Sequence, residues 1–379
     1  MKIAVAKETE FGERRVALVP EIASRLAKKE GVELWVEAGA GAGAYIADEA
    51  YEKAGATIIG DPEALWREAD VLLKVAPPKG EEIDRLKEGA TLISFLNPLG
   101  EPERVRHLAD RRVTALSVEL IPRTSRAQSM DALSSQANIA GYKAVLIAAT
   151  TLPKFFPMLT TAAGTIRPAK AFIVGAGVAG LQAIATARRL GAVVEAFDIR
   201  PEVKEQVQSL GAKFVEVNLE EETTTEGGYA KEISERSKEL TQEAIARSVA
   251  QSDVVITTAQ VPGKKAPRII TDAMVSQMKP GSVIVDLAGE QGGNCEGTEA
   301  GKDVIRHGVT LIGPINLPSS MPVHASQLYA KNISTFLEYL MKDGELKLDF
   351  EDDIPASTCV AYSGEIRNDR VKKALEVAV

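Results

Sequence analysis

The chain of 379 residues carries 45 Lys and Arg against 53 Asp and Glu, a net charge of −8, with two Cys and a hydrophobic fraction of 45%. At about 150 residues per domain, this length predicts two or three domains and excludes a single small module. The mild acidity, with basic residues scattered along the chain, disfavours nucleic acids and membrane surfaces as partners.

Cysteine usage and the first residues favour a reducing cytoplasm. Cys295 and Cys359 are too few and too isolated to form a disulfide framework or a metal cluster. The first six residues, MKIAVA, resemble a strand and lack the long apolar core of a signal peptide. The most apolar stretches, 144–152 and 171–187, fall short of about eighteen uninterrupted apolar residues, so we expect no membrane span.

Short apolar runs alternate with charged segments of helix length along most of the chain. The first series of runs comprises Ile3–Val5, Glu33–Val36, Thr57–Ile59, Val71–Val75, Thr91–Leu96 and Val113–Ser117. The second series comprises Lys170–Val174, Val193–Phe197, Ala212–Val217, Asp253–Thr257, Ser282–Asp286 and Val309–Ile312. Because strand and helix alternate in both series, the sequence predicts an α/β protein with two Rossmann-like domains built on parallel sheets.

Two long helices are predicted to join the domains. Ser134–Thr151 has small and apolar residues at helical spacing and no Pro, and Val323–Leu340 also has the pattern of a helix. The final segment, Lys347–Val379, is too short for a domain and should pack on the first half, so that the chain crosses twice and a cleft lies between the domains. The predicted bounds are 1–135 with 328–379 for the first domain, and 136–327 for the second.

A glycine pattern opens the second series. Gly175, Gly177 and Gly180 follow an apolar strand and precede an Ala-rich helix, in the spacing G-x-G-x-x-G. Gly175 allows the tight turn, Gly177 lets the backbone approach a pyrophosphate, and Gly180 lets helix and strand pack closely. The helix N-terminus adds N–H donors and a positive dipole. This context predicts a dinucleotide site, to which we also assign Val178.

An acidic residue about twenty positions further on completes the pattern. Asp198 ends the next strand, where it can accept hydrogen bonds from the adenosine ribose and repel a 2′-phosphate, which favours NAD over NADP. Arg200 is dissonant, because a nearby Arg can accommodate a 2′-phosphate. We give Asp198 more weight since it lies at the strand end itself. Ile199, between the two, is assigned to the same site.

Two further loops are predicted at the carboxyl edge of the second sheet, where ligands of open α/β sheets bind. Thr258, Ala259 and Gln260 follow a strand and are predicted to line the adenine or nicotinamide ribose. Asp286–Gly293 (DLAGEQGG) is a strand-end loop with paired glycines, in which Glu290 would face the same crevice. A plain β-to-α turn explains this second loop nearly as well.

The first half also contains glycines, but they do not form a second nucleotide fingerprint. Gly39, Gly41 and Gly43 lie in a loop that follows the strand-like residues WVEA, without the G-x-G-x-x-G spacing. The chain therefore has one complete fingerprint. A second nucleotide would have to be bound by a different polypeptide.

These motifs together resemble the soluble NAD(H)-binding alpha subunit of proton-translocating NAD(P) transhydrogenase, over essentially the whole chain. They also resemble alanine dehydrogenase, a relative with the same two-domain plan. The shared marks are KETEFGERRVALVP at Lys7–Pro20, Lys74 at a strand end, GAGVAG and DLAGEQGG. The choice between the two families has to come from residues at which they differ.

The residue at the end of the Thr91–Leu96 strand favours the transhydrogenase. Alanine dehydrogenase-like sequences place a His there, and their reaction needs a general acid and base, whereas this chain has Asn97, which cannot titrate. The three histidines lie in other contexts, at His107, His307 and His324. Arg15 and Lys74, which would grip a substrate carboxylate in the relative, are retained, so a residual small-acid pocket stays open as an alternative.

The segment Pro122–Gln136 (PRTSRAQSMDALSSQ) closely matches the transhydrogenase segment that surrounds the nicotinamide. By that resemblance, the nicotinamide carboxamide, ribose and pyrophosphate region are held by Arg123, Gln128, Asp131 and Ser134. Gln and Ser can each donate or accept a hydrogen bond, and Arg with Asp can form a charge-assisted pair. The alternative is a polar loop that enters a helix, with Ser125 or Ser129 as its N-cap.

The acidic, threonine-rich segment Asn218–Gly228 is interpreted as a long loop between a strand and a helix that starts near Tyr229. Composition alone leaves a mobile loop and a disordered insertion equally open. Residues 227–231 (GGYAK) resemble the mobile loop with which transhydrogenases close over bound nucleotide. By that resemblance, Gly228 and Tyr229 belong to a lid that expels water from the hydride path.

The resemblance implies direct hydride transfer between NAD(H) on this chain and NADP(H) on a partner subunit. Such a transfer needs positioning and water exclusion, and no acid, base, metal or nucleophile. The implied partners are an NADP(H)-binding subunit and a membrane-embedded subunit that couples the transfer to proton translocation. This chain would be a homodimer, cytoplasmic and peripheral on the membrane. The alternatives are an alanine dehydrogenase-like NAD-dependent oxidoreductase and a non-catalytic NAD-binding subunit.

Overall fold

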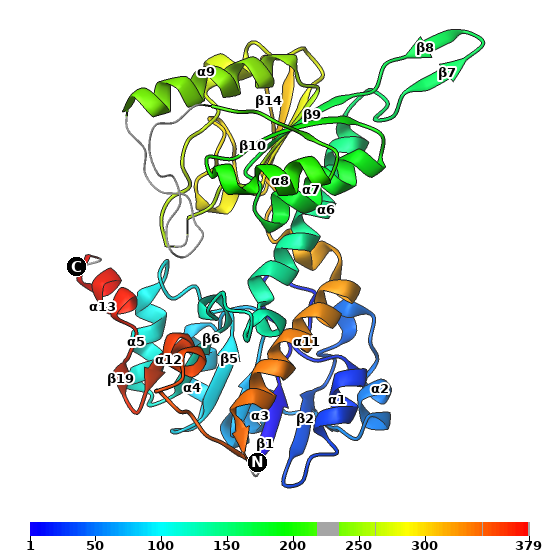
Figure 1. Ribbon diagram of the computed structural model, residues 1–379. Helices are drawn as coiled ribbons and strands as arrows, with labels where there is room; N and C mark the ends of the chain where they lie inside the picture. Colours follow the sequence, from blue (N-terminus) through cyan, green and yellow to red (C-terminus); the bar gives the residue numbers. More distant parts are fainter. Residues whose placement is uncertain (218–234, 262, 343, 378–379) are drawn as a thin grey trace. The chain divides into compact units, whose positions relative to one another are not determined.

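The chain folds into two α/β units, which confirms the predicted fold class (Figure 1). The computed structural model describes residues 1–217, 235–261, 263–342 and 344–377. The two units are Met1–Gln136 with Pro318–Val379, here called the first unit, and Ala137–Leu317, the second unit.

The boundary after the second unit differs from the predicted one. Residues 318–327, assigned from the sequence to the second domain, group with the first unit. Helix α11 (Pro322–Leu340) has only just begun when Ser326 accepts a hydrogen bond from the Val16 N–H at 3.0 Å. Ser319 also bonds to the N-terminal segment. The chain has therefore returned to the first unit before this helix starts.

The first unit is built on an eight-stranded sheet in the order β19-β18-β6-β5-β4-β1-β2-β3. The strands from β3 to β6 are parallel, and their order, 3-2-1-4-5-6, is that of a doubly wound Rossmann sheet. β18, from the C-terminal segment, adds antiparallel to β6. The strand bounds are β1 (Lys2–Val5), β2 (Glu33–Glu37), β3 (Thr57–Ile59), β4 (Val71–Leu73), β5 (Thr91–Ser94), β6 (Thr114–Ser117), β18 (Cys359–Tyr362) and β19 (Glu365–Ile366).

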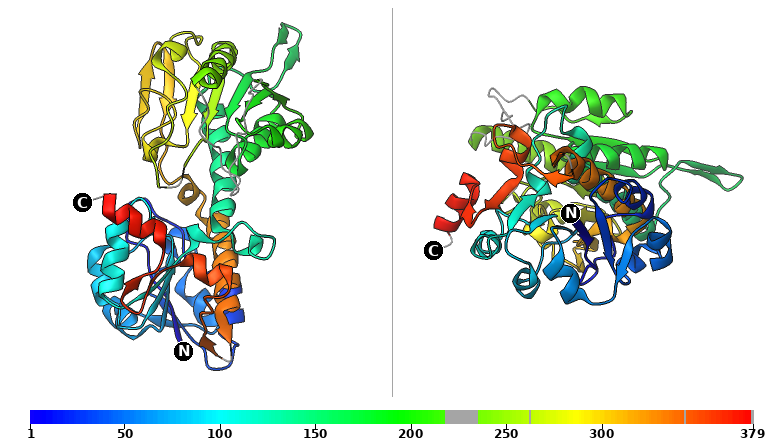
Figure 2. Two further views of the ribbon diagram at one scale, coloured as in Figure 1. Left: turned by 60° about the vertical axis from the view of Figure 1, so that its left-hand side comes forward. Right: turned by 90° about the horizontal axis from the view of Figure 1, so that it is seen from below.

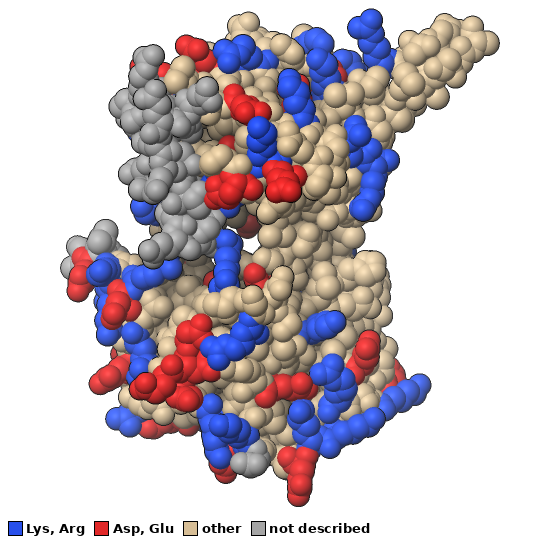
Figure 3. Space-filling view, viewed as in Figure 1, with Lys and Arg blue, Asp and Glu red and all other residues tan. Residues whose placement is uncertain are grey.

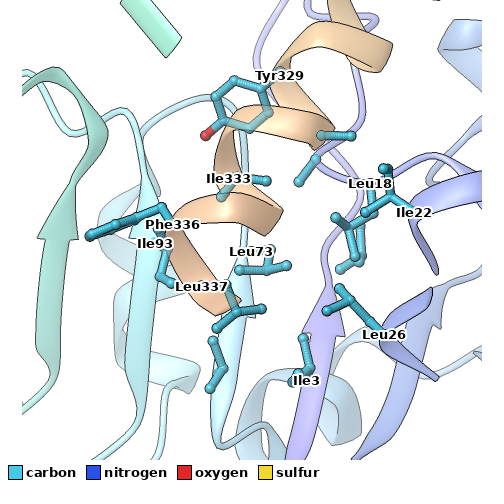
Figure 4. Close-up of a cluster of buried hydrophobic side chains, with 14 of the residues drawn as sticks. Ile3, Leu18, Ile22, Leu26, Leu73, Ile93, Tyr329, Ile333, Phe336 and Leu337 are labelled. Carbon is cyan, nitrogen blue, oxygen red and sulfur yellow. The ribbon is translucent and has the colours of Figure 1, made fainter. Parts of the chain in front are cut away.

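Helices cover both faces of this sheet (Figure 2). On one face, α11 packs Tyr329, Ile333 and Phe336 toward strand residues that include Leu73 and Ile93 (Figure 4), and all five are buried. Two short strands, β16 (Met341–Lys342) and β17 (Glu345–Leu346), follow α11. The other helices that contribute to this unit are α1 (Pro20–Leu26), α2 (Asp48–Lys53), α3 (Pro62–Glu68), α4 (Gly80–Arg85), α5 (Pro102–Asp110), α6 (Ala132–Thr151), α12 (Asp353–Thr358) and α13 (Asp369–Val377).

The second unit repeats the plan in a seven-stranded sheet, β11-β10-β9-β12-β13-β15-β14. Its parallel strands again follow the order 3-2-1-4-5-6, and β14 pairs antiparallel at the edge. The strands are β9 (Lys170–Val174), β10 (Val193–Phe197), β11 (Lys213–Phe214), β12 (Val254–Thr257), β13 (Val283–Asp286), β14 (Asp303–Arg306) and β15 (Val309–Ile312). The helices are α7 (Val178–Arg189), α8 (Lys204–Ser209), α9 (Glu235–Gln251) and α10 (Asp272–Val275).

The sequence prediction located the parallel strands and the long helices correctly. Every predicted apolar run contains one parallel strand of its sheet. The helix predicted over Ser134–Thr151 is α6, and the one predicted over Val323–Leu340 is α11, each beginning one or two residues earlier than predicted. The predicted helix start near Tyr229 lies outside the described residues.

A two-stranded hairpin, β7 (Leu159–Thr161) and β8 (Gly164–Ile166), is a feature that the sequence analysis did not predict. It projects from the body of the second unit in Figures 1 and 2. Its base is fixed by Phe156, which is buried and whose carbonyl accepts a hydrogen bond from the Ala169 N–H at 3.1 Å. Residues 155–166 carry no charged side chain, and Figure 3 shows the hairpin as an uncharged surface.

Cys295 and Cys359 are free and buried. Burial raises the pKa of each thiol to about 12, so both stay protonated and unreactive at neutral pH. Among the described residues, no group of three or more His, Cys, Asp and Glu is placed to hold a metal ion. Within the same residues, no helix combines the length and hydropathy that crossing a bilayer requires.

Candidate functional site

The glycine loop lies at the carboxyl edge of the second sheet, where the strand order reverses. β9 pairs with β10 on one side and with β12 on the other, so the loops that follow β9 and β12 leave a crevice of the kind in which open α/β sheets bind ligands. The two loops are also bonded to each other. Thr258 donates its N–H to the Val174 carbonyl at 2.9 Å and its hydroxyl to the Gly175 carbonyl at 3.1 Å.

Each fingerprint glycine has its own reason to lack a side chain. Gly175 has a φ of +95°, and a Cβ there would lie 2.5 Å from Thr258 Oγ1. A Cβ at Gly180 would lie 1.8 Å from the Gly175 carbonyl oxygen, so α7 packs directly on the loop. Around a Cβ at Gly177, the described residues leave open space. Gly177 is the N-cap of α7 and Val178 its first residue, and open space beside N–H groups that the helix does not use suits an anionic ligand group.

Asp198 is buried and its carboxylate is already paired. Oδ2 accepts hydrogen bonds from the Ala176 N–H at 2.7 Å and from Arg200 Nη2 at 2.9 Å. Oδ1 accepts from the Arg200 N–H at 2.9 Å and from Arg200 Nε at 3.0 Å. The hydrogen bond with Asp198 raises the pKa of the Arg200 guanidinium. The sequence analysis opposed these two residues as signals, whereas the structure pairs them. A ribose hydroxyl that binds Asp198 has to replace one of these donors.

Ile199, between these two residues, packs against a buried cluster of the second unit. This cluster is made mainly of strand residues such as Phe172 and Ile284, together with side chains of α9. Ile199 is therefore half-buried, and its side chain supports the strand end that carries the Asp198 carboxylate. Its assignment to the nucleotide stays a prediction.

An asparagine that the sequence analysis missed fixes the loop after β12. Asn294 is fully buried; its Oδ1 accepts from the Ala259 N–H at 3.0 Å, and its Nδ2 donates to the carbonyls of Ala259 at 2.8 Å and Pro267 at 2.9 Å. Gln260 Nε2 donates to the Leu287 carbonyl at 2.7 Å. Asn294 directly follows the paired glycines of DLAGEQGG, which was the only signal available from the sequence.

The DLAGEQGG loop itself is held from inside by Asp286. Its buried carboxylate accepts three hydrogen bonds, from Thr257 Oγ1 at 2.8 Å, the Ala288 N–H at 3.0 Å and the Cys295 N–H at 2.9 Å. Asp286 therefore shapes the loop. Glu290 is exposed in the 3₁₀ turn η5 (Gly289–Gln291), and its contact with a ligand stays a prediction.

In the first unit, the segment that follows β6 leads into helix α6. The helix begins at Ala132, and Asp131 is its N-cap: the carboxylate accepts the Ser134 N–H at 2.9 Å and the Ser134 hydroxyl at 2.6 Å. The alternative in which Ser125 or Ser129 caps this helix is therefore wrong. Asp131 and Ser134 are fixed relative to each other before any ligand binds.

Gln128 and Arg123 are exposed ahead of this helix. Gln128 begins the 3₁₀ turn η3 (Gln128–Met130), and the carbonyl of Ser129 in that turn accepts a hydrogen bond from Asn332 Nδ2 of α11 at 2.8 Å. The turn is thereby anchored to the first unit while its amide side chain is exposed. A fixed turn with an exposed amide suits a group that orients a bound ring.

Arg15 and Lys74 are buried and paired with carboxylates of the same unit. Arg15 contacts Glu13 through Nε at 2.8 Å and Nη2 at 2.6 Å, and donates to Gln136 Oε1 at 3.0 Å. Lys74 Nζ lies 3.1 Å from Glu8 Oε2, and the side chains of this pair are 1% and 3% exposed. A small substrate acid would have to displace these carboxylates, which disfavours the residual small-acid pocket.

Asn97 closes a turn after β5. It has a left-handed φ of 49°, which Asn tolerates better than most residues, and its N–H donates to Glu119 Oε1 at 2.6 Å. Two of the histidines contact surface carboxylates instead, His107 with Asp84 at 2.9 Å and His307 with Asp272 at 2.8 Å. Asn97 thus has a conformational reason to be there, beside the chemical one.

The predicted site residues therefore form two groups, each described within its own unit. The second unit gathers the glycine loop, the Asp198 strand end and the loop after β12. The first unit gathers the residues between β6 and α6. Gly228 and Tyr229, assigned to the lid, lie outside the described residues.

Two family models match most of the chain. Residues 4–140 match "Alanine dehydrogenase/PNT, N-terminal domain" and residues 144–369 match "Alanine dehydrogenase/PNT, C-terminal domain". The chain belongs to the alanine dehydrogenase/PNT family. The resemblance stated from the motifs is thereby confirmed, and both named branches of the alanine dehydrogenase/PNT family have relatives of this chain.

Relatives from the transhydrogenase branch of the alanine dehydrogenase/PNT family are the more similar ones. The first of the two parts of NAD(P) transhydrogenase subunit alpha from Rhodospirillum rubrum is 49% identical over 375 residues, covering 97% of each chain. The crystal structure of transhydrogenase from Sinorhizobium meliloti is 44% identical with a TM-score of 0.84, covering 97% of this chain and 99% of that one. Alanine dehydrogenase of Bacillus subtilis is 33% identical and covers 85% of this chain and 81% of its own.

Proposed function

We propose that this chain is the NAD(H)-binding component of a proton-translocating NAD(P) transhydrogenase. In this proposal, hydride passes directly between NAD(H) bound here and NADP(H) on a partner subunit, and a membrane-embedded subunit couples the transfer to proton movement. The observation that carries the proposal is the open Gly177 at the N-terminus of α7, beside the buried Asp198. The 49% identity to a transhydrogenase alpha subunit supports the choice of partner.

The chain's own groups bind and orient the nucleotide, and bound NAD(H) supplies the hydride chemistry. The proposed nucleotide contacts are Gly175, Gly177, Val178, Gly180, Asp198, Ile199, Arg200, Gly228, Tyr229, Thr258, Ala259 and Gln260. The groups proposed to orient the nicotinamide are Arg123, Gln128, Asp131 and Ser134. The transfer needs alignment and exclusion of water, which these residue types supply without a titrating side chain.

Alanine dehydrogenase-like chemistry is the second candidate, and the retained Arg15 and Lys74 favour it. Interconverting alanine and pyruvate moves protons as well as a hydride and needs a titratable group in reach of the substrate. Asn97 stands where alanine dehydrogenase-like sequences have His, and the carboxylates of Glu13 and Glu8 already bind the two cations. The transhydrogenase role fits these residues better.

One assay separates the candidates. The purified chain is mixed with NADH and an NADP analogue, with and without an NADP(H)-binding subunit, and separately with pyruvate and ammonia. The proposal expects turnover only when the NADP(H)-binding subunit is present. Turnover with pyruvate and ammonia alone would establish the alanine dehydrogenase alternative, and NADH binding without turnover in any mixture would establish a non-catalytic subunit.

Replacement of Gln128 by alanine is expected to slow hydride transfer by about 10- to 100-fold while the NADH dissociation constant changes less than about threefold. The exposed amide orients the ring in the transfer geometry and contributes little to holding the nucleotide. Single-turnover transfer rates and fluorescence titration with NADH measure the two effects. Ser129→Ala, on the same turn, is the matched control. Equal losses in rate and affinity would show that Gln128 is merely a binding contact.

The β7–β8 hairpin is our proposed location for the homodimer contact that the family resemblance implies. A two-stranded hairpin alone is marginally stable in water, and this one is free of charge and exposes Met158 at 64% and Ile166 at 45%. A second copy of the chain would cover it. The peripheral, cytoplasmic placement of the dimer is proposed from its partners alone.

An aspartate in place of Met158 is expected to convert the dimer to a monomer at micromolar concentration, because an unpaired charge would be buried in the contact. Sedimentation equilibrium gives the mass directly. Ile305→Asp, on the edge strand β14, alters a residue that is 74% exposed and should leave the mass unchanged. An unchanged dimer in the Met158 variant would exclude the hairpin from the interface.

A further inference from the structure

A rigid turn near the N-terminus exposes an aromatic ring that the proposed nucleotide site does not use. Phe11 is 91% exposed, in a hydrogen-bonded turn over residues 10–13 in which Gly12 has a φ of +79°. Ser319, itself 2% exposed, accepts the Arg14 N–H at 2.7 Å and donates to the Gly12 carbonyl at 2.7 Å. The turn is thus anchored at its end, and it holds a large apolar side chain in water.

The glycine-rich loop after β2 places a second aromatic ring beside this turn. A Cβ at Gly43 would lie 2.7 Å from the Arg14 carbonyl oxygen, so the loop packs directly on the Arg14 backbone. Tyr45, two residues further on, is 76% exposed and has a φ of 62°, a conformation that few non-glycine residues adopt. Arg14 donates to the Tyr45 hydroxyl at 2.7 Å, and its guanidinium lies 5.2 Å from the ring centroid.

We propose that Phe11, Arg14 and Tyr45, here called the aromatic rim, form a docking surface for the NADP(H)-binding partner subunit. This inference rests on the proposed function. Aromatic rings and arginine are the residue types that carry most of the binding energy at protein interfaces. The contacts of Ser319 and Gly43 fix their backbone in advance, so docking loses little conformational freedom.

The position of the rim on the sheet identifies its occupant. Direct transfer brings two nicotinamide rings into contact, so the partner has to cover the carboxyl edge of the first sheet around residues 123–134, which follow β6. The rim follows β1 and β2 at the same edge, and β1 is the third strand from β6, at about 14 Å. One partner's usual contribution of about 800 Å² extends about 16 Å from its centre. A partner centred on residues 123–134 therefore reaches the rim.

The test uses Phe11→Ala, Tyr45→Ala and the double variant, each titrated with the purified NADP(H)-binding subunit from the same organism. Two readouts are taken: the subunit concentration at half-maximal transfer, and the dissociation constant of the two proteins by calorimetry. Ile305→Ala, which truncates an apolar side chain of similar exposure on β14, is the matched control. Thermal melts and NADH titration verify that each variant is folded.

Each single variant should raise the half-saturating concentration and the dissociation constant about tenfold, and the double variant about 100-fold. The transfer rate at saturating partner and the NADH affinity should be unchanged, as should every value for Ile305→Ala. A change below twofold in the double variant, or a loss of NADH affinity, would overturn the proposal. Absence of transfer by the parent chain would refute the proposed function instead, and calorimetry would then still decide whether the rim binds the subunit.

Discussion

Alanine at position 180 is expected to abolish NADH binding and to loosen the second unit. A Cβ there would lie 1.8 Å from the Gly175 carbonyl oxygen and 2.8 Å from its carbon, so α7 has to move away from the glycine loop. The loop cannot yield easily, because Thr258 bonds to its backbone. We expect overpacking to cost about 1–3 kcal/mol of stability. NADH affinity should fall at least 100-fold, measured by fluorescence titration beside a thermal melt.

Gly177→Ala is the matched control, since it separates binding from packing. A Cβ at Gly177 meets nothing within 4 Å among the described residues, and its φ of −74° is ordinary for alanine. Stability should fall by less than about 1 kcal/mol, the usual scale of an N-cap change. NADH affinity should still drop more than tenfold, because the methyl group enters the space that the pyrophosphate needs. Unchanged affinity would contradict the placement of the pyrophosphate on this loop.

Methionine in place of Lys74 is expected to cost about 3–5 kcal/mol of folding stability, because it leaves the buried carboxylate of Glu8 without its cation. Lys74 Nζ also lies 3.7 Å from Glu82, a second carboxylate with little exposure, which adds to the effect. Denaturant unfolding followed by circular dichroism measures the loss. Lys79→Met is the control: its contact with Glu10 is about half exposed on both sides, and such surface pairs contribute about 0–1 kcal/mol.

The loss in the Lys74 variant should depend on pH. Burial raises the pKa of Glu8, and Lys74 opposes that effect, so removing Lys74 raises the pKa of Glu8 further. A carboxyl whose pKa is higher in the folded state than in the unfolded state stabilises the fold when protonated, and this contribution is lost as pH rises through the folded value. The difference between variant and parent should therefore shrink from pH 8 to pH 5. Glu8→Gln in the Lys74→Met background should remove this pH dependence.

The strands could be predicted from the sequence where burial makes them apolar throughout. Val71–Val75 and Ser282–Asp286 belong to parallel strands covered on both faces, and such runs stand out against charged neighbours. The same rule misses strands that are exposed. β14 alternates charged and apolar residues at the sheet edge, and the β7–β8 hairpin has no core behind it. The return of β18 to the first sheet depends on a partner more than 200 residues away.

The candidate site divides along the same line. The roles of the three fingerprint glycines follow from a short stretch of backbone, so spacing alone suggested them. Pairings between side chains are different, because a sequence shows which donors and acceptors exist and not which ones meet. The bond of Asn294 to the loop after β12 was missed for this reason, and the pairing of Asp198 with Arg200 was read as a conflict.

The first unit is assembled from both ends of the chain. β1 forms from the first residues, whereas α11 and β18, which complete its core and its sheet, come from residues after 318. The second unit is one continuous stretch. During synthesis at about 5–20 residues per second, it is complete several seconds before the C-terminal segment emerges. A nascent chain should therefore gain its nucleotide loop first, while the sheet face that α11 later covers stays exposed to chaperones until the last segment arrives.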